Sequence, residues 1–145
     1  MSTTLVPKVI LLADDDPDDA EMFALVLSDV DPTVKLHHVK DGLAVFEHLK
    51  QPGNQLPDMI FLDINMPEMN GWQCLSMLKG SSRTKDIPVL IYSTSSHSRD
   101  KQTATELGAT AFITKPSDYK TLRKILSSIA ASIGNGVKST TDKLG

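Results

Sequence analysis

A chain of 145 residues with 40% hydrophobic and 23% charged residues has the length and composition of one globular domain. Its net charge of -3 and its scattered lysines and arginines argue against a nucleic-acid-binding protein. The single cysteine, Cys74, excludes an internal disulfide framework and a cysteine-rich metal site. Residues Met1 to Lys8 are too few and too polar for a signal peptide, and no apolar run could span a bilayer. We therefore expect a reducing, cytoplasmic setting without a membrane partner.

Strand-like apolar runs alternate with helix-like periods five times, a pattern that predicts β-α units and a parallel sheet. The expected strands lie at about 8–13, 34–39, 59–62, 87–92 and 110–114. The expected helices lie at about 18–30, from the Asp41-Gly42 turn up to Pro52, and at about 71–79, 97–107 and 118–133. The fold class is therefore α/β, with a doubly wound five-stranded parallel sheet and helices on both of its faces.

The predicted elements account for one domain. Residues 6–133 are expected to form it, and the small, polar residues 134–145 to form a flexible C-terminal tail. Because the sequence ends where an output domain would begin, we expect a stand-alone protein. The first helix is expected to bury one apolar stripe, made of Phe23, Ala24, Leu27 and Val30.

Two of the apolar runs end in aspartate. Val9 to Ala13 is followed directly by Asp14, Asp15 and Asp16, and Met59 to Leu62 is followed by Asp63. Strands that are apolar along their whole length are buried on both faces, and the carboxyl ends of parallel strands share one edge of the sheet. The sequence thus predicts several carboxylates close together, where their mutual repulsion requires a cation or a shared proton.

Two further polar groups reach the same edge. The fourth strand ends at Ser93, and the fifth is followed by Lys115. A carboxylate, a hydroxyl and an ammonium group together suit phosphoryl transfer, in which the protein positions groups and neutralises charge. We expect Asp63 to act as the nucleophile and carry the phosphoryl group as an acyl phosphate. Ser93 and Lys115 would then pair with the phosphoryl oxygens.

The acid pair predicts a magnesium site. Mg²⁺ typically takes one or two protein carboxylates, several waters and a phosphate oxygen. We expect Asp15 and Asp63 to bind the ion directly and Asp14 to hold a coordinated water. The backbone carbonyl of Asn65 is a further expected ligand, and Mn²⁺ is expected to substitute for Mg²⁺.

Four segments, in this order and at matching strand ends, point to a known family. They are Asp14-Asp15, Asp63-Ile64-Asn65-Met66-Pro67-Glu68-Met69-Asn70-Gly71, Ser93-Thr94 and Phe112-Ile113-Thr114-Lys115-Pro116. Over nearly the whole chain the sequence resembles the receiver domain of bacterial two-component response regulators. The resemblance implies a flavodoxin-like sheet of order 2-1-3-4-5. It also implies that Asp63 accepts phosphate from a histidine kinase or a His-phosphotransfer protein.

The resemblance carries further expectations about signalling. Such a domain is not an enzyme beyond its own magnesium-dependent phosphorylation and dephosphorylation. Phe112 stands where the family has a Tyr or Phe that changes rotamer, so Ser93 and Phe112 are the expected switch. The switch would alter the face formed by the fourth helix, fifth strand and fifth helix, and so the binding of a downstream protein. A monomer or a weak homodimer is expected.

Within the family, the acidic opening at 14–19 and the stretch 87–96 resemble those of regulators paired with bacteriophytochrome-type histidine kinases. Ser93 replaces the more usual Thr but keeps the hydroxyl donor. Ser95, two residues later, offers neither an acid nor an amide to orient an attacking water.

Other interpretations stay open from sequence. Asp18 and Asp19 are interpreted as acids that cap a helix or complement its dipole. A phosphatase of the haloacid dehalogenase type would need a second acid where Asn65 stands, and a scaffold of the same fold would exchange no phosphate. A cis Lys115-Pro116 bond is compatible with X-Pro chemistry.

Overall fold

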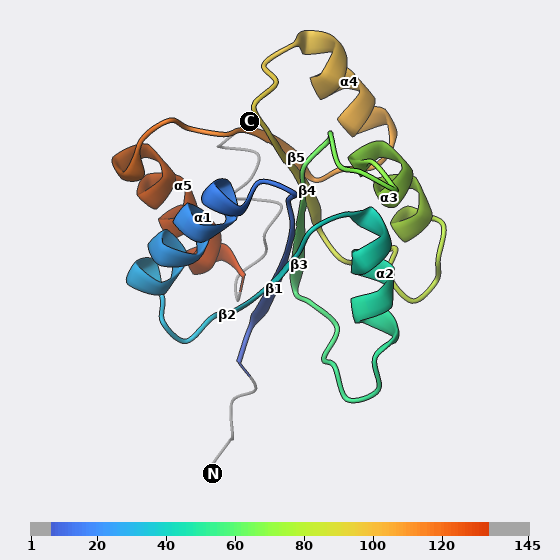
Figure 1. Cartoon of the computed structure of the whole chain (residues 1–145), viewed down its shortest axis with the longest axis horizontal. Helices are drawn as coiled ribbons and strands as arrows, with labels where there is room; N and C mark the ends of the chain where they lie inside the picture. Colours follow the sequence, from blue (N-terminus) through green and yellow to red (C-terminus); the bar gives the residue numbers. More distant parts are fainter. Residues whose placement is uncertain (1–6, 134–145) are drawn as a thin grey trace.

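The computed structural model describes residues 7–133, which form a parallel five-stranded sheet of order β2-β1-β3-β4-β5. The strands are β1 (Val9–Ala13), β2 (Lys35–Val39), β3 (Met59–Leu62), β4 (Val89–Ser93) and β5 (Ala111–Thr114). The helices are α1 (Pro17–Val30), α2 (Gly42–Lys50), α3 (Gly71–Lys79), α4 (Ser98–Glu106) and α5 (Tyr119–Ser132). Helices α1 and α5 cover one face of the sheet, and α2, α3 and α4 lie on the other (Figure 1). The predicted flavodoxin-like α/β fold is confirmed.

The predicted tail at 134–145 lies outside the described residues. Among residues 7–133, no helix combines the length and apolar character that crossing a membrane requires.

Each face of the sheet has its own apolar layer. All five side chains of β1 are buried, and they alternate between the two faces as strand geometry requires. Ile10 and Leu12 join the layer under α1 and α5, whereas Leu11 and Ala13 join the layer under α2, α3 and α4. The Phe23 ring of α1 contacts the Phe61 and Tyr92 rings edge-on, with centroids 5.0 and 5.5 Å apart.

Two details of the sequence prediction need correction. Ala24 is exposed, and α1 buries Ala20 and Val26 beside Phe23 and Leu27, because the helix turns a slightly different stripe toward the sheet. β4 begins at Val89 and not near residue 87, since a proline at position 88 has no N–H for the ladder. The Lys115–Pro116 bond, for which the sequence left both isomers open, is trans, as are all peptide bonds among residues 7–133.

The edge strand β2 is largely exposed, and its two histidines point to opposite faces. The Nε2 atom of His38 is hydrogen bonded to the Asp14 carbonyl at 2.8 Å, whereas the His37 ring lies 4.8 Å from the ring of His48 on α2. Joint metal binding by His37 and His38 is thereby excluded. Cys74 is fully buried in α3, and burial raises the pKa of its thiol to about 12.

Candidate functional site

The hydrogen-bond ladder of the sheet sets Asp14 and Asp63 side by side. The Asp63 amide donates to the Ala13 carbonyl at 3.0 Å, which extends the pairing of β3 with β1 one residue past the strand. The Asp14 amide donates to the Val39 carbonyl of β2, also at 3.0 Å. Both aspartates are therefore the first residues beyond two neighbouring buried strands, at the carboxyl edge of the sheet.

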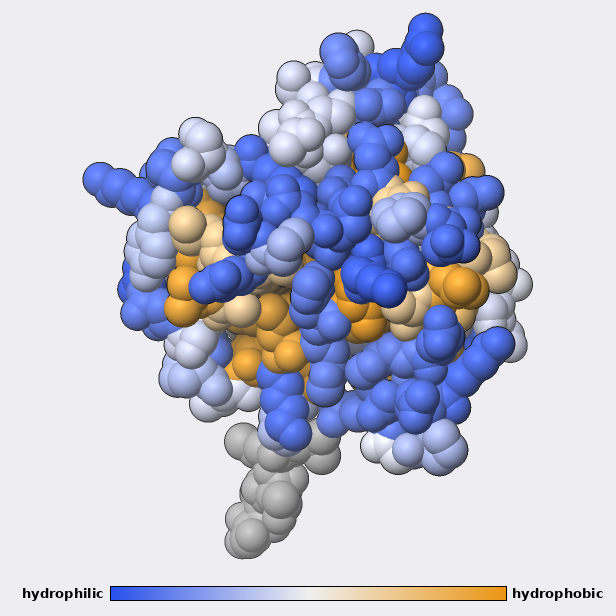
Figure 2. Space-filling view, viewed as in Figure 1, coloured by the Kyte–Doolittle hydropathy of each residue, from blue (hydrophilic) through white to orange (hydrophobic). Residues whose placement is uncertain are grey.

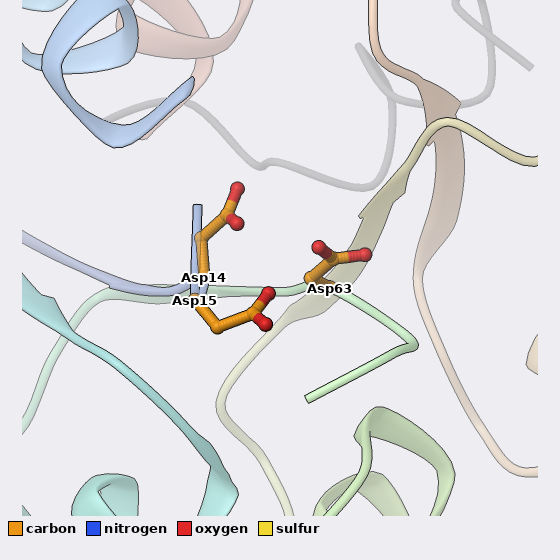
Figure 3. Close-up of side chains that lie close together, drawn as sticks. All are labelled: Asp14, Asp15 and Asp63. Atoms are coloured by element: carbon orange, nitrogen blue, oxygen red, sulfur yellow. The ribbon is translucent and has the colours of Figure 1, made fainter. Parts of the chain in front are cut away.

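Three carboxylates gather at this edge. Asp14, Asp15 and Asp63 each offer one oxygen within 4.8 Å of the others, and the carboxyl groups at the ends of β1 and β3 face a common space (Figure 3). Asp14 and Asp63 are buried, whereas Asp15 is exposed to solvent. Like charges at this spacing repel, so the cluster favours bound positive charge. Carboxylate oxygens are also the ligands that Mg²⁺ prefers, so the donor set fits such an ion.

The buried carboxylate of Asp14 is the most constrained of the three. Its Oδ1 atom accepts a hydrogen bond from the Asp16 amide at 2.9 Å. Its Oδ2 atom makes no hydrogen bond of ordinary geometry within residues 7–133 and meets the Lys115 ammonium as an ion pair at 2.8 Å. Burial raises the pKa of Asp14, although the contact with Lys115 and the Asp16 amide oppose that shift. Among residues 7–133, Lys115 is therefore the one group that holds this oxygen, and a metal ion or its water would compete with the ammonium for it.

Lys115 supplies the positive charge at this edge. Its ammonium lies 2.8 Å from Asp14 Oδ2, 2.8 Å from Asp19 Oδ2 and 3.2 Å from Asp63 Oδ2. The side chain is only 7% exposed. Burial alone would lower the pKa of Lys115, but the close contacts with Asp14 and Asp19 and the charges of Asp14 and Asp63 raise it above its ordinary value. The group therefore stays protonated at neutral pH.

Ser93 stands beside this cluster as the last residue of β4, and its side chain is buried. The Ser93 carbonyl accepts a hydrogen bond from the Lys115 amide at 2.7 Å, so the two residues lie at adjoining strand ends. The Ser93 hydroxyl oxygen accepts from the Ser95 amide at 3.1 Å, and no hydrogen bond joins it to Asp63 in the described part of the chain. Phe112, paired with Ile91 in the sheet, is half-buried beneath the same edge.

Asn65 lies in the loop after β3 with its side chain exposed. Within residues 7–133 its carbonyl accepts no hydrogen bond, so it is available to a ligand. The structure thus brings Asp14, Asp15, Asp63 and Lys115 into one cluster, with Ser93 at the adjacent strand end and Asn65 on the loop above.

Asp19 is the residue that sequence reasoning missed. The sequence assigned Asp19 to the cap or the dipole of the first helix, but the N-cap of α1 is Asp16. The Asp16 carboxylate accepts hydrogen bonds from the amides of Asp18 and Asp19. The Asp19 carboxylate instead contacts Lys115, whereas Asp18 is exposed. The position of Asp19 in the first turn of α1, directly after the acidic segment that begins at Asp14, was the available signal. Which of the two adjacent acids faces the lysine depends on the rotation of α1.

A doubly wound α/β domain with carboxylates and a lysine at the carboxyl edge of its sheet is the design of a phosphoacceptor signalling module. The chain belongs to the response regulator receiver family: the model of the response regulator receiver domain matches residues 10–127. Receiver domains take their phosphoryl groups from histidine kinases and are signalling modules, not catalytic enzymes.

Individual relatives agree with this assignment. Response regulator Rcp1 of Synechocystis sp. is 33% identical over 127 residues, covering 85% of this chain and 86% of that protein. The phosphorylated cyanobacterial phytochrome response regulator RcpA has a similar structure, with a TM-score of 0.80, 28% identity, and coverage of 90% of this chain and 96% of that one. The Mn²⁺-bound form of Rcp1 gives a TM-score of 0.76 at 32% identity, covering 86% of this chain and 93% of that one.

Proposed function

We propose that Asp63 accepts a phosphoryl group from a sensor histidine kinase or a His-phosphotransfer protein. The observation that carries the proposal is the Lys115 ammonium 3.2 Å from Asp63 Oδ2, beside the acidic pair that follows β1. A carboxylate oxygen of Asp63 attacks phosphorus, the P–N bond to the donor histidine breaks, and the imidazole leaves with the electron pair and takes up a proton. Lys115 and the Ser93 hydroxyl then pair with the phosphoryl oxygens.

Mg²⁺ is the proposed cofactor, with Mn²⁺ able to replace it. Asp15 and Asp63 would bind the ion directly, Asp14 would hold one of its waters, and the Asn65 carbonyl would complete the protein ligands. When bound, such an ion neutralises charge on the attacking and transferred oxygens. The unpartnered Asn65 carbonyl, the acidic cluster and the Mn²⁺ described for the Rcp1 structure support this assignment.

The proposed switch passes from Ser93 to α4. The Ser95 amide is bonded to the Ser93 hydroxyl, and the Ser95 hydroxyl donates to Asp100 of α4 at 2.5 Å. If Ser93 turns toward a phosphoryl oxygen, this chain of bonds must rearrange and Phe112 gains room to rotate inward. Helix α4 is weakly anchored, because Ala104 is its only fully buried side chain and its outer surface is hydrophilic to neutral (Figure 2). Phosphorylation would thus alter the α4-β5-α5 face.

The wider assignments belong to the same proposal. Residues 6–133 are the receiver domain, located in the cytoplasm as is typical of the family. Similarity to Rcp1 and RcpA supports a phytochrome-type histidine kinase as the phosphodonor. The output is a downstream protein, bound by a monomer or weak homodimer, with no direct contact to nucleic acid.

The phosphoacceptor is tested with acetyl phosphate and Mg²⁺, comparing the wild-type chain with Asp63→Asn. The wild type should gain a base-labile adduct of one phosphoryl group by mass spectrometry, and the variant, which lacks the nucleophilic carboxylate, should gain none. Asp58→Asn is the matched control, because Asp58 directly precedes β3, whereas Asp63 directly follows it. An adduct of equal yield in Asp63→Asn would refute the assignment. Turnover of many phosphate esters would indicate the phosphatase, and a wild type without any adduct the scaffold.

Replacing Phe112 with alanine tests the switch. Acetyl phosphate should modify this variant as readily as the wild type, because Phe112 is not among the residues of the charged cluster. Hydrogen exchange in α4 should rise on phosphorylation of the wild type and change much less in the variant, which has no ring to move into the space behind Ser93. Equal exchange responses in the two proteins would exclude this route.

A further inference from the structure

The Lys115 ammonium is shared by carboxylates from three separate elements. An ammonium has three N–H donors, and here three acids surround it: Asp14 after β1, Asp63 after β3 and Asp19 in the first turn of α1. Of these three acids, Asp14 and Asp63 belong, with Asp15, to the cluster that can hold a metal ion, and Asp19 does not. Asp19 is the one partner of Lys115 that has no place in the metal site.

The three acids in contact with Lys115 also differ in solvent exposure. The side chain of Asp14 is fully buried, that of Asp63 is 11% exposed and that of Asp19 is 38% exposed. The Lys115 backbone N–H donates a hydrogen bond to the Ser93 carbonyl, and the ammonium lies over the Tyr92 ring, 5.6 Å from its centroid. Asp19 therefore approaches the ammonium from the outer side. It links the start of α1 to the end of β5.

Binding of a divalent ion changes this balance. The oxygens of Asp14 and Asp63 cannot serve the ion and the ammonium equally, and two positive charges at this edge repel each other. The ion does not compete for the Asp19 carboxylate. When Asp14 and Asp63 turn toward the ion, Asp19 is therefore the acid that continues to hold the Lys115 ammonium. An ammonium without that contact would stay on Asp14 and Asp63 and compete with the ion.

We propose that Asp19 is a positioning residue for Lys115: it holds the ammonium at the outer rim, so that Asp14 and Asp63 can turn to the ion and the phosphoryl group. This inference rests on the proposed function in so far as the acidic cluster binds Mg²⁺. Beyond the proposed function, Asp19 should affect the affinity for Mg²⁺ by holding the Lys115 ammonium, and not only by adding a negative charge near the ion.

The chain contains its own control for the effect of charge. Asp18 is adjacent in the same turn, is exposed and makes no ion pair within residues 7–133, so Asp18→Asn removes the same charge without touching Lys115. Asp19→Asn should raise the Kd for Mg²⁺, measured by isothermal titration of the full chain, about two- to fivefold above that of Asp18→Asn, the range of a partly exposed ion pair. Asp19→Glu, which keeps the acid, should restore most of the affinity.

Two further measurements separate positioning from a general structural role. In a Lys115→Gln background, Asp19→Asn and Asp18→Asn should have equal Kd values for Mg²⁺, because there is no ammonium to hold. The ¹⁵N resonance of the Lys115 ammonium, visible when its protons exchange slowly, should broaden in Asp19→Asn and persist in Asp18→Asn.

The outcomes are distinct. Equal Kd values for the two variants in the wild-type background, or a difference that persists without Lys115, would overturn the role of Asp19 while leaving the metal site intact. A wild-type chain that binds no Mg²⁺ would instead remove the metal site of the proposed function, and this inference with it.

Discussion

An alanine at Phe23 should lower the free energy of unfolding by about 3–5 kcal/mol, the range for large-to-small changes at a closely packed aromatic site. Phe23 is fully buried, and its ring meets Phe61 of β3 and Tyr92 of β4 edge-on at 5.0 and 5.5 Å. These partners are anchored in central strands, which cannot move inward without breaking the ladder. The space left by the ring would therefore stay largely empty.

Urea unfolding followed by circular dichroism measures this change. Met22→Ala is the matched control, because Met22 precedes Phe23 on the same helix and is 42% exposed. Its effect should stay within about 0.5 kcal/mol. A loss below about 1.5 kcal/mol for Phe23→Ala would mean that the layer under α1 and α5 can close over the missing ring.

An alanine at Gly71 should damage both stability and the site. A Cβ atom there would lie 2.2 Å from the Asp63 carbonyl oxygen and 2.9 Å from the Ile64 Cα, and both of these are backbone atoms. The start of α3 would have to move away from β3, although the Gly71 amide is bonded to the Ile64 carbonyl at 2.8 Å. We expect a loss of about 1–3 kcal/mol or more in unfolding free energy, as for other overpacked positions.

The displaced backbone carries Asp63, the proposed phosphoacceptor, so phosphorylation should be affected as well as stability. Phosphorylation of Gly71→Ala by acetyl phosphate should slow by about 10- to 100-fold, since small misplacements of reacting groups have effects of that size. The control is Gly80→Ala at the other end of α3, where the nearest atom would be the Ser76 carbonyl at 3.3 Å. A folded Gly71→Ala protein with the wild-type rate would show that the β3-α3 loop adapts without moving Asp63.

The sequence predicts the strand ends well, because two simple patterns define them. Fully apolar runs specify buried parallel strands, and Asp14 and Asp63 follow such runs directly. The structure pairs Ala13 with Leu62, so both carboxylates reach the same edge as expected. Ser93, as the last residue of β4, and Lys115, bonded to its carbonyl, follow from the same rule.

What could not be predicted depends on how elements rotate against each other. The stripe of α1 that meets the sheet includes Val26 and not Ala24, and apolar periodicity alone did not fix that angle. The same rotation decides that Asp19, and not Asp18, faces Lys115. Helix propensity and capping rules treat these two acids alike, because they describe a helix before it packs.

Because the two apolar layers lie on opposite sides of the sheet, the stability of one layer need not limit conformational change in the other. The Phe23 cluster lies under α1 and α5, whereas the loosely held α4 belongs to the opposite layer. The sheet thus separates the Phe23 cluster from α4, which is the one helix of residues 7–133 with a single fully buried side chain. Substitutions that reinforce the Phe23 cluster should therefore raise the melting temperature without adding contacts to α4, the helix that the proposed switch would displace.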